Sequence, residues 1–209
     1  MIFIAGTGTG VGKTLISSIL LVASQGNYWK PVQAGLEPST DTEWVKLNTG
    51  LPESDFIPEK HIFKAPESPH YASKLENTTV ELSKLQPPIT NQKLIIEGAG
   101  GILVPLNETE TFLDYIKLYN LPVVLVAGYY LGAINHTLLS IEIIKQSNVK
   151  INAVILNGEW KSHASSFLIN KYNDLLFFDI PDIKNINKVE IIKAASYLKT
   201  QKNWEKILL

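Results

Sequence analysis

The chain has 209 residues, the length of one large domain, and we expect a single domain over residues 1–209. Its 19 basic and 20 acidic residues give a net charge of −1, which excludes a strongly basic protein that binds nucleic acids. Every basic residue is Lys and the chain has no Cys, which excludes arginine clamps on phosphates, disulfides, thiolate nucleophiles and zinc–thiolate sites.

Short apolar runs alternate along the chain with longer stretches of helical character. The runs predict strands at 2–5, 28–32, 94–97, 123–127, 153–157 and 175–180. The stretches predict helices near 13–25, 41–48, 111–119, 135–147, 163–173 and 188–200, the last beginning with Asn187 and Glu190 at capping-box spacing. Most strands are continuous Val, Ile, Leu and Phe runs, as in strands covered on both faces. This order predicts an α/β fold, a parallel sheet flanked by helices on both faces.

Residues 50–92 interrupt the alternation. Prolines are frequent there, and a short helix is expected only near 70–76. We interpret the segment as a long connection over the edge of the sheet, of the kind that often carries function, and not as a second domain.

The apolar runs are too short for a membrane protein. Residues 1–5 lack the basic flank of a signal peptide, and residues 121–130 cannot span a bilayer. We therefore expect a soluble cytoplasmic protein with neither a membrane nor a nucleic acid as partner.

A glycine-rich loop follows the first predicted strand, with the sequence Gly6-Thr7-Gly8-Thr9-Gly10-Val11-Gly12-Lys13-Thr14. Strand, loop, Gly-Lys-Thr and apolar helix in this order are the context of a phosphate-binding loop, although the loop is one residue longer than the usual spacing. Glycines allow backbone N–H groups to approach phosphate oxygens, and the helix N-terminus adds positive partial charge. We expect Lys13 to reach the β- and γ-phosphates and the Thr14 hydroxyl to bind Mg²⁺. The alternative is a glycine-rich turn with a chance Gly-Lys-Thr.

Two carboxylates and one lysine are candidates to complete this site. Glu97 ends a strand of buried character, at the sheet edge where open α/β folds bind ligands, although it could be an ordinary loop carboxylate. Asp41 opens a predicted helix and could bind Mg²⁺ or only cap that helix. Lys30 lies in an aromatic and aliphatic strand, where it needs an anionic partner unless it reaches solvent from an edge strand.

Five motifs occur in order: Gly-Thr-x-Thr-x-Val-Gly-Lys-Thr at 6–14, Lys-Pro-Val-x-x-Gly at 30–35, Ser-Pro-His at 68–70, Glu-Gly-Ala-Gly-Gly at 97–101 and Leu-Gly-x-Ile-Asn-His at 131–136. With them the chain resembles the dethiobiotin synthetases, from residue 2 to about residue 158 and more weakly to about residue 183. The resemblance implies a homodimeric enzyme with a P-loop NTPase-like fold. It also implies the reaction of 7,8-diaminononanoate (7,8-diaminopelargonate), CO₂ and MgATP to dethiobiotin, ADP and phosphate, through a carbamate and a carbamic–phosphoric anhydride.

The resemblance assigns roles by matching position. The implied catalytic residues are Lys30, Lys13 and Thr9, with the charge of Lys30 stabilising negative charge at the reacting carbamate. The implied Mg²⁺ ligands are Thr14, Asp41 and Glu97. The implied contacts to the nucleotide are Gly10, Val11, Gly12, Lys13, Thr14, Leu15, Asp41, Glu97, Gly98, Ala99, Gly100, Asn157, Gly158, Pro181, Asp182 and Ile183, with the Asn157 amide on the base. The implied contacts to the diamine are Lys30, Ala34, Gly100 and, from the neighbouring subunit, Ala133, Ile134 and Asn135.

Simpler roles stay open for several of these residues. Asn135 could be a helix N-cap, Asn157 a strand-ending turn residue, and His70 and His136 either structural residues or contacts to substrate. Ala34 stands where the family commonly has a hydroxyl, which removes a hydrogen bond worth about 1 kcal/mol, and Gln33 could replace it.

A second candidate function is a switch or partitioning ATPase of the MinD/ParA-like type, similar to cell-division positioning proteins. Such proteins usually carry an extra Lys early in the phosphate loop, where this chain has Thr7 and Gly8, and some end in an amphipathic membrane helix. We interpret residues 188–209 instead as a helix that packs on the core and exposes its lysines. The amide-forming cobyrinate-type synthetases usually have a glutaminase domain with a Cys nucleophile, which the chain lacks.

Overall fold

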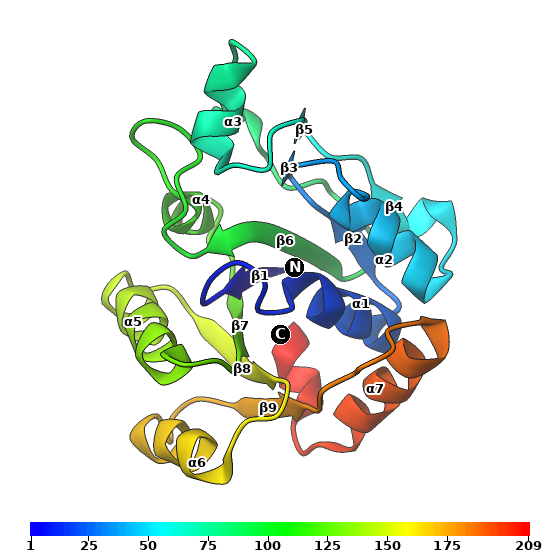
Figure 1. Cartoon of the computed structure of the whole chain (residues 1–209), viewed down its shortest axis with the longest axis vertical. Coiled ribbons are helices and arrows are strands. Elements are labelled where there is room, and N and C mark those ends of the chain that lie inside the picture. Colours follow the sequence, from blue (N-terminus) through cyan, green and yellow to red (C-terminus); the bar gives the residue numbers. More distant parts are fainter.

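A parallel sheet of seven strands organises the computed structural model, which describes residues 1–209 (Figure 1). The strand order is β4-β2-β6-β1-β7-β8-β9. The strands are β1 (Ile2–Gly6), β2 (Asn27–Trp29), β4 (Phe56–Ile57), β6 (Leu94–Gly101), β7 (Val123–Gly128), β8 (Ile151–Asn157) and β9 (Phe177–Ile180). All neighbours pair in parallel, as the alternation of strands and helices predicts.

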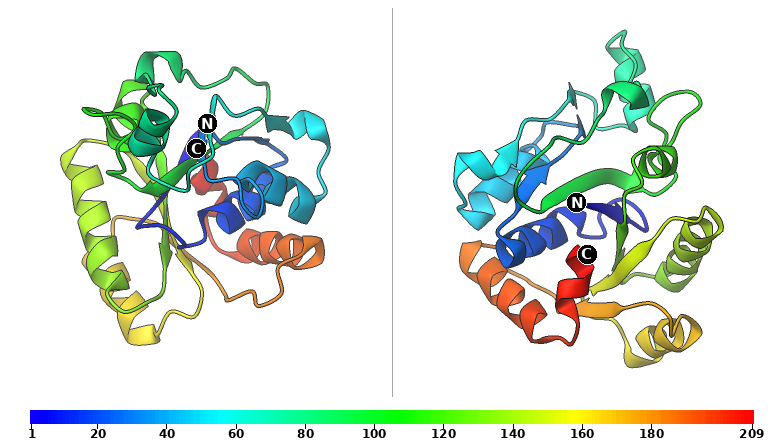
Figure 2. Two further views of the ribbon diagram at one scale, coloured as in Figure 1. Left: turned by 45° about the horizontal axis from the view of Figure 1, so that its top comes forward. Right: turned by 180° about the vertical axis from the view of Figure 1, so that it is seen from behind.

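Helices cover both faces of this sheet (Figures 1 and 2). One layer is made by α1 (Lys13–Ser24), α2 (Asp41–Thr49) and α7 (Lys188–Thr200). The other layer is made by α3 (Pro69–Leu75), α4 (Phe112–Leu118), α5 (Ala133–Gln146) and α6 (Ser162–Lys171). Alternate residues of each strand point into the two layers, so Ile2 and Ile4 join the core under α1 while Phe3 joins the core under α4. The two buried cores contain 24 and 27 residues, so neither face of the sheet is left open.

The predicted strand at 28–32 is wrong as a single element. The structure divides it into β2 and β3 (Val32–Ala34), because Pro31 has no N–H for a strand ladder and interrupts the pairing. β3 pairs in parallel with β5 (His61–Phe63) in a second, two-stranded sheet. Residues 50–92 also contain β4 and two 3₁₀ turns, Glu53–Asp55 and Leu82–Lys84, so the long connection is more ordered than the sequence predicts.

The predicted strand at 94–97 extends through the glycines to Gly101. A Cβ at Gly98 would lie 2.7 Å from the Phe3 ring, so only glycine lets β6 continue beside β1 at this point. The other differences are shifts of element ends: α5 begins at Ala133 instead of 135, and β9 begins at Phe177 instead of 175.

The C-terminal helix packs as the sequence predicts. The Asn187 side chain caps α7 by accepting hydrogen bonds from the backbone of Val189 and Glu190, whereas the Glu190 side chain pairs with Lys193. Ile191 and Leu198 are buried in the core that also contains α1, and a last 3₁₀ turn spans Trp204–Leu208. No helix in the structure has the length and apolar character needed to cross a bilayer.

Candidate active site

The phosphate loop connects β1 to α1 at the carboxyl ends of the strands. Gly10 and Gly12 have φ angles of +72° and +94°, in the left-handed region that favours glycine. Gly12 is the N-cap of α1 and no side chain caps this helix. The Lys13 Nζ atom donates to the Gly8 carbonyl at 3.0 Å, so the lysine folds back along the loop. Uncapped helix amides and a lysine at one place form a site suited to phosphate groups.

The three residues predicted to bind Mg²⁺ converge in the structure. The Thr14 Oγ1 atom lies 2.8 Å from Glu97 Oε1 and 3.2 Å from Asp41 Oδ1. Mg²⁺ in nucleotide sites usually takes one or two carboxylates and completes its shell with phosphate oxygens and water, so this donor set fits the ion. The N-cap of α2 is Thr40, so the alternative that Asp41 is only a helix cap is wrong.

Lys30 lies between the two carboxylates. Its Nζ atom is 2.5 Å from Asp41 Oδ2 and 3.2 Å from Glu97 Oε1, and it donates to the Gly98 carbonyl at 3.0 Å. The Lys30 side chain is only 3% exposed, so the alternative that it reaches solvent from an edge strand is wrong. The anionic partner that its burial requires is supplied by Asp41 and Glu97.

The charged groups in this cluster shift one another's pKa values. Burial lowers the pKa of Lys30, but the carboxylates of Glu97 and Asp41 outweigh burial and the pKa is raised. Burial, followed by repulsion from Lys30, lowers the pKa of Lys13 to about 8. Burial raises the pKa of Asp41, but Lys30 outweighs it and holds that pKa below its usual value. Both lysines and Asp41 are therefore predominantly charged at neutral pH.

Sequence reasoning missed Tyr28. This fully buried residue of β2 donates its hydroxyl to Glu97 Oε2 at 3.0 Å. Burial, followed by the Glu97 charge, raises the pKa of Tyr28 well above its ordinary value, so the hydroxyl keeps its proton. A signal was available, because a Tyr in a strand of buried character needs a polar partner for its hydroxyl.

The Gln33 side chain fixes the start of α2. Its Oε1 atom accepts from the Asp41 backbone N–H at 3.1 Å, and its Nε2 atom donates to the Gly35 carbonyl at 2.8 Å. Ala34, the next residue, is half-buried at the end of β3. Both ends of the Gln33 amide are engaged, so in this structure it does not replace the hydroxyl that Ala34 lacks.

Several other predicted residues also lie around the phosphate loop. A Cβ built on Gly100 would be 3.6 Å from the Thr9 hydroxyl, so Thr9 lies beside the end of β6. The Asn157 Nδ2 atom donates to the Val11 carbonyl at 3.1 Å, which joins the end of β8 to the loop. Gly98, Ala99 and Gly100 belong to β6, and Val11 of the loop and Leu15 of α1 are buried.

The predicted segments near the ends of β9 and β7 lie further along the sheet edge. Pro181, Asp182 and Ile183 line a cavity of 610 Å³ together with residues of α7. Ala133, Ile134 and Asn135 form the first turn of α5, whose N-cap is Gly132, so the alternative of Asn135 as the N-cap is wrong. The roles of both segments in binding remain predictions.

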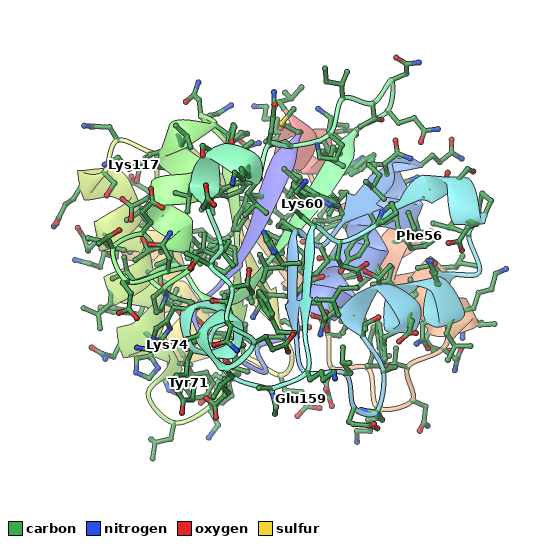
Figure 3. The ribbon with its side chains drawn as sticks, turned by 90° about the horizontal axis from the view of Figure 1, so that it is seen from above. Phe56, Lys60, Tyr71, Lys74, Lys117 and Glu159 are labelled. Carbon is green, nitrogen blue, oxygen red and sulfur yellow. The ribbon has the colours of Figure 1, made fainter.

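The two histidines have local partners. The His70 Nδ1 atom lies 2.8 Å from Ser68 Oγ, and the His136 Nδ1 atom lies 2.7 Å from the Tyr130 hydroxyl. Figure 3 shows Tyr71, next to His70 on α3, and Glu159, after β8, toward the same edge of the molecule. Neither the His70–Ser68 contact nor the His136–Tyr130 contact involves the cluster around Lys30.

Proteins of similar sequence point to one family. Residues 1–199 match a family described as an AAA domain. The ATP-dependent dethiobiotin synthetase BioD of Cytophaga hutchinsonii is 38% identical over 203 residues, which are 97% of each chain. The protein of the same name from Afipia carboxidovorans is 43% identical over 157 residues, 75% of each chain.

Solved structures support the fold. A ParA family ATPase from Chlorobium tepidum superposes with a TM-score of 0.56 at 15% identity, covering 99% of this chain and 95% of that chain. A putative plasmid partition protein from Borrelia burgdorferi bound to AMPPNP gives a TM-score of 0.54 at 13% identity, covering 96% of this chain and 98% of that chain. At such identities the likeness shows only a shared P-loop NTPase-like fold. The relative from Cytophaga hutchinsonii, which matches almost the whole chain, shows together with the family match that the chain belongs to the family of ATP-dependent dethiobiotin synthetases.

Proposed function

We propose that the chain converts 7,8-diaminononanoate, CO₂ and ATP to dethiobiotin, ADP and phosphate. The observation that carries the proposal is the buried Lys30 ammonium group, held by Asp41, Glu97 and the Gly98 carbonyl next to the phosphate loop. A cation fixed beside a phosphate site is suited to a reaction that transfers a phosphoryl group to a second anion. Membership of the family supplies the identity of that anion, a carbamate.

The proposed reaction has three steps. One amine of the diamine attacks the carbon of CO₂, forms a C–N bond and loses a proton, which gives the carbamate. A carbamate oxygen then attacks the γ-phosphorus, the bond to the bridging oxygen breaks, and ADP leaves. The second amine attacks the carbon of the resulting mixed anhydride, loses a proton, and expels phosphate as the cyclic urea closes.

The residues of the chain would stabilise the negative charge in these steps. Lys13 and the backbone amides of residues 10–15 bind the phosphates of ATP, and the Thr9 hydroxyl, next to Gly100, contacts the carbamate side. Lys30 stabilises the charge shared between the carbamate and the moving phosphoryl group. No Arg exists in the chain, so the chain's own part in stabilising this charge comes from two lysines and the helix amides.

Thr14, Asp41 and Glu97 would hold Mg²⁺. The distances of 2.8 and 3.2 Å between the hydroxyl and the two carboxylates support this assignment. When bound, Mg²⁺ neutralises charge on the β- and γ-phosphates. We propose that further contacts to the nucleotide come from Gly98, Ala99, Asn157, Gly158, and the segment Pro181, Asp182 and Ile183.

We further propose that two copies of the chain form a homodimer, in which the first turn of α5 (Ala133, Ile134 and Asn135) binds the carboxylate of the diamine held by the neighbouring subunit. The N-cap of this helix is Gly132, so no side chain caps it, and the Ala133 N–H donates to the Tyr130 carbonyl at 3.0 Å. The N–H groups of Ile134 and Asn135 are then the ones that would bind an anion. The loop before it exposes Tyr129, Tyr130 and Leu131, apolar side chains that a second subunit would cover.

The test is to mix the purified protein with MgATP, bicarbonate and the diamine. We expect ADP and the cyclic urea to form in equal amounts, measured by a coupled ADP assay and mass spectrometry. ADP release that does not depend on the diamine, with no cyclic urea, would overturn the proposal and favour a switch ATPase.

A further inference from the structure

The two oxygens of the Glu97 carboxylate have different partners. Oε1 faces the site, 2.8 Å from the Thr14 hydroxyl and 3.2 Å from the Lys30 ammonium. Oε2 faces the core and accepts a hydrogen bond from the Tyr28 hydroxyl at 3.0 Å. The Glu97 side chain has no exposed surface, so bulk water does not reach either oxygen.

The register of the sheet places the Tyr28 hydroxyl at this point. Tyr28 of β2 is paired with Ile95 of β6, and Glu97 lies two residues further along β6 on the same face. On its other side Tyr28 is paired with Phe56 of β4, and the two rings pack edge to face with centroids 6.1 Å apart. Figure 3 labels Phe56 on the side of the molecule that carries α2. The ring is therefore confined by two strands, and its hydroxyl points to Glu97.

A carboxylate that is held through only one oxygen can still change its orientation about the last bond of the side chain. Thr14 and Lys30 hold Oε1, but both are also expected to contact ATP or its products and so to change partners during the reaction. Tyr28 is fully buried in the core under α1, so it is not exposed to bound ATP and its bond to Oε2 does not need to break. It is thus the partner of Glu97 that can remain constant.

We propose that Tyr28 is a positioning residue that, through its bond to Oε2, holds Oε1 of Glu97 toward Thr14 in the orientation that binds a divalent cation. This inference rests on the role of Glu97 in the proposed function. Tyr28 itself contacts neither the cation nor ATP. Residues that orient a metal ligand from behind usually change metal affinity or activity by about 10- to 100-fold when they are replaced.

The substitution Tyr28→Phe tests this inference, because it removes the hydroxyl and keeps the ring between β4 and β6. Tyr115→Phe is the matched control. Tyr115 is also fully buried, its ring packs against Phe3, and its hydroxyl has no hydrogen-bond partner. Both substitutions therefore remove one buried hydroxyl, but only one of them removes a bond to Glu97.

The measurement is ATP binding by isothermal titration calorimetry, first in EDTA and then at rising Mg²⁺ concentration. We expect Tyr28→Phe to bind ATP in EDTA as the unmodified chain does, and to need about 10- to 100-fold more Mg²⁺ for the full increase in affinity. Tyr115→Phe should match the unmodified chain in both conditions. In activity assays, excess Mg²⁺ should restore most of the turnover of Tyr28→Phe.

An unchanged Mg²⁺ requirement in Tyr28→Phe would overturn the inference. An equal loss of ATP affinity in EDTA and in Mg²⁺, or a variant that does not fold, would also overturn it, because the hydroxyl would then have only a structural role. In a Glu97→Gln background, Tyr28→Phe should produce no further change in the Mg²⁺ requirement, and an additive change would contradict action through Glu97.

These outcomes are separate from the proposed function. A chain that forms no cyclic urea but shows the Mg²⁺ shift would refute the reaction and keep the role of Tyr28. A chain that forms the cyclic urea but shows no shift of the Mg²⁺ requirement in Tyr28→Phe would keep the reaction and refute the role of Tyr28. ATP binding by the unmodified chain that is independent of Mg²⁺ would overturn the role of Tyr28.

Discussion

Glu97 and Asp41 contact the same lysine, yet two very different regions hold them. Glu97 lies within β6, which pairs on both sides, with Ile4 of β1 directly beside it, and it is 1% exposed. Asp41 is the first residue of α2, its side chain is 34% exposed, and its backbone is held by the Gln33 side chain. The sheet thus provides one carboxylate that the fold itself fixes, and the connection after β3 provides one that depends on a few polar contacts. Replacing Glu97 should therefore destabilise the fold, whereas replacing Asp41 should mainly weaken cation binding.

Lys30 joins the two regions, and its removal should have the largest effect. We expect Lys30→Ala to lower kcat by roughly 10²- to 10³-fold while ATP affinity changes much less, because the charge acts mainly in the transition state. Steady-state kinetics and calorimetry on the same preparation provide the comparison. Lys74→Ala, at an exposed lysine of α3, is the control and should change neither. Equal losses of turnover and ATP affinity would mean that Lys30 only positions the nucleotide.

The free energy of unfolding should separate the two carboxylates. Without divalent cations, Glu97→Gln should cost about 3–5 kcal/mol, because it disrupts a fully buried ion pair and the bond from Tyr28. Asp41→Asn should cost about 1 kcal/mol, because its ion pair is partly exposed. Urea unfolding followed by circular dichroism measures both values. Equal costs would remove the distinction between a carboxylate fixed by the sheet and one held by the loop.

The lowered pKa of Lys13 predicts how ATP binding depends on pH. Its pKa of about 8 lies below the ordinary 10.5, so free Lys13 loses its proton as the pH rises through 8. ATP affinity should be nearly constant below pH 7 and fall by up to about tenfold per pH unit above pH 8. Between pH 8 and 10.5 the unfolded chain binds more protons at this group, so there Lys13 makes stability rise with pH. AMP is the control ligand, because it lacks the phosphates that Lys13 binds, and an equally steep fall for AMP would contradict the assignment.

The smallest expected effect concerns Gln33. Gln33→Leu removes the acceptor of the Asp41 backbone N–H and should cost about 1 kcal/mol of stability. It should also raise the Mg²⁺ requirement for ATP binding by a few fold, because Asp41 becomes less well placed. Thr40→Ala, which breaks the capping box of the same helix, should cost a similar stability with a smaller change in the Mg²⁺ requirement. The reverse order would show that the helix cap, not Gln33, positions Asp41.

The same two regions differ in what the sequence predicts. β1, β6, β7 and β8 contain apolar runs with strong local signals. The phosphate loop directly follows the run of β1 and Glu97 directly follows the run of β6, so the sequence locates both. β3, β4 and β5 have only two or three residues each, and their pairing depends on segments far away in the chain. The sequence also predicts that Lys30 needs an anion, but not that two carboxylates share it.

The supporting residues could not be located from local patterns. Tyr28 and Glu97 are 69 positions apart, and their contact depends on the register between β2 and β6. The sequence suggests Gln33 only as a replacement for the hydroxyl missing at Ala34, whereas its side chain is 5% exposed and bonded at both ends. Contacts of Pro181, Asp182 and Ile183 to the nucleotide, and of Ala133, Ile134 and Asn135 to the diamine, rest on the family resemblance and stay predictions.

In the proposed reaction a carbamate, and not water, accepts the phosphoryl group beside Lys30. A single turnover started with ¹⁸O-labelled CO₂ distinguishes the two acceptors, because the carbamate oxygen that attacks phosphorus must leave with the phosphate when the ring closes. We predict that mass spectrometry will find one ¹⁸O atom in the phosphate released with each molecule of cyclic urea. Phosphate without the label would show that water is the acceptor, and it would contradict this account.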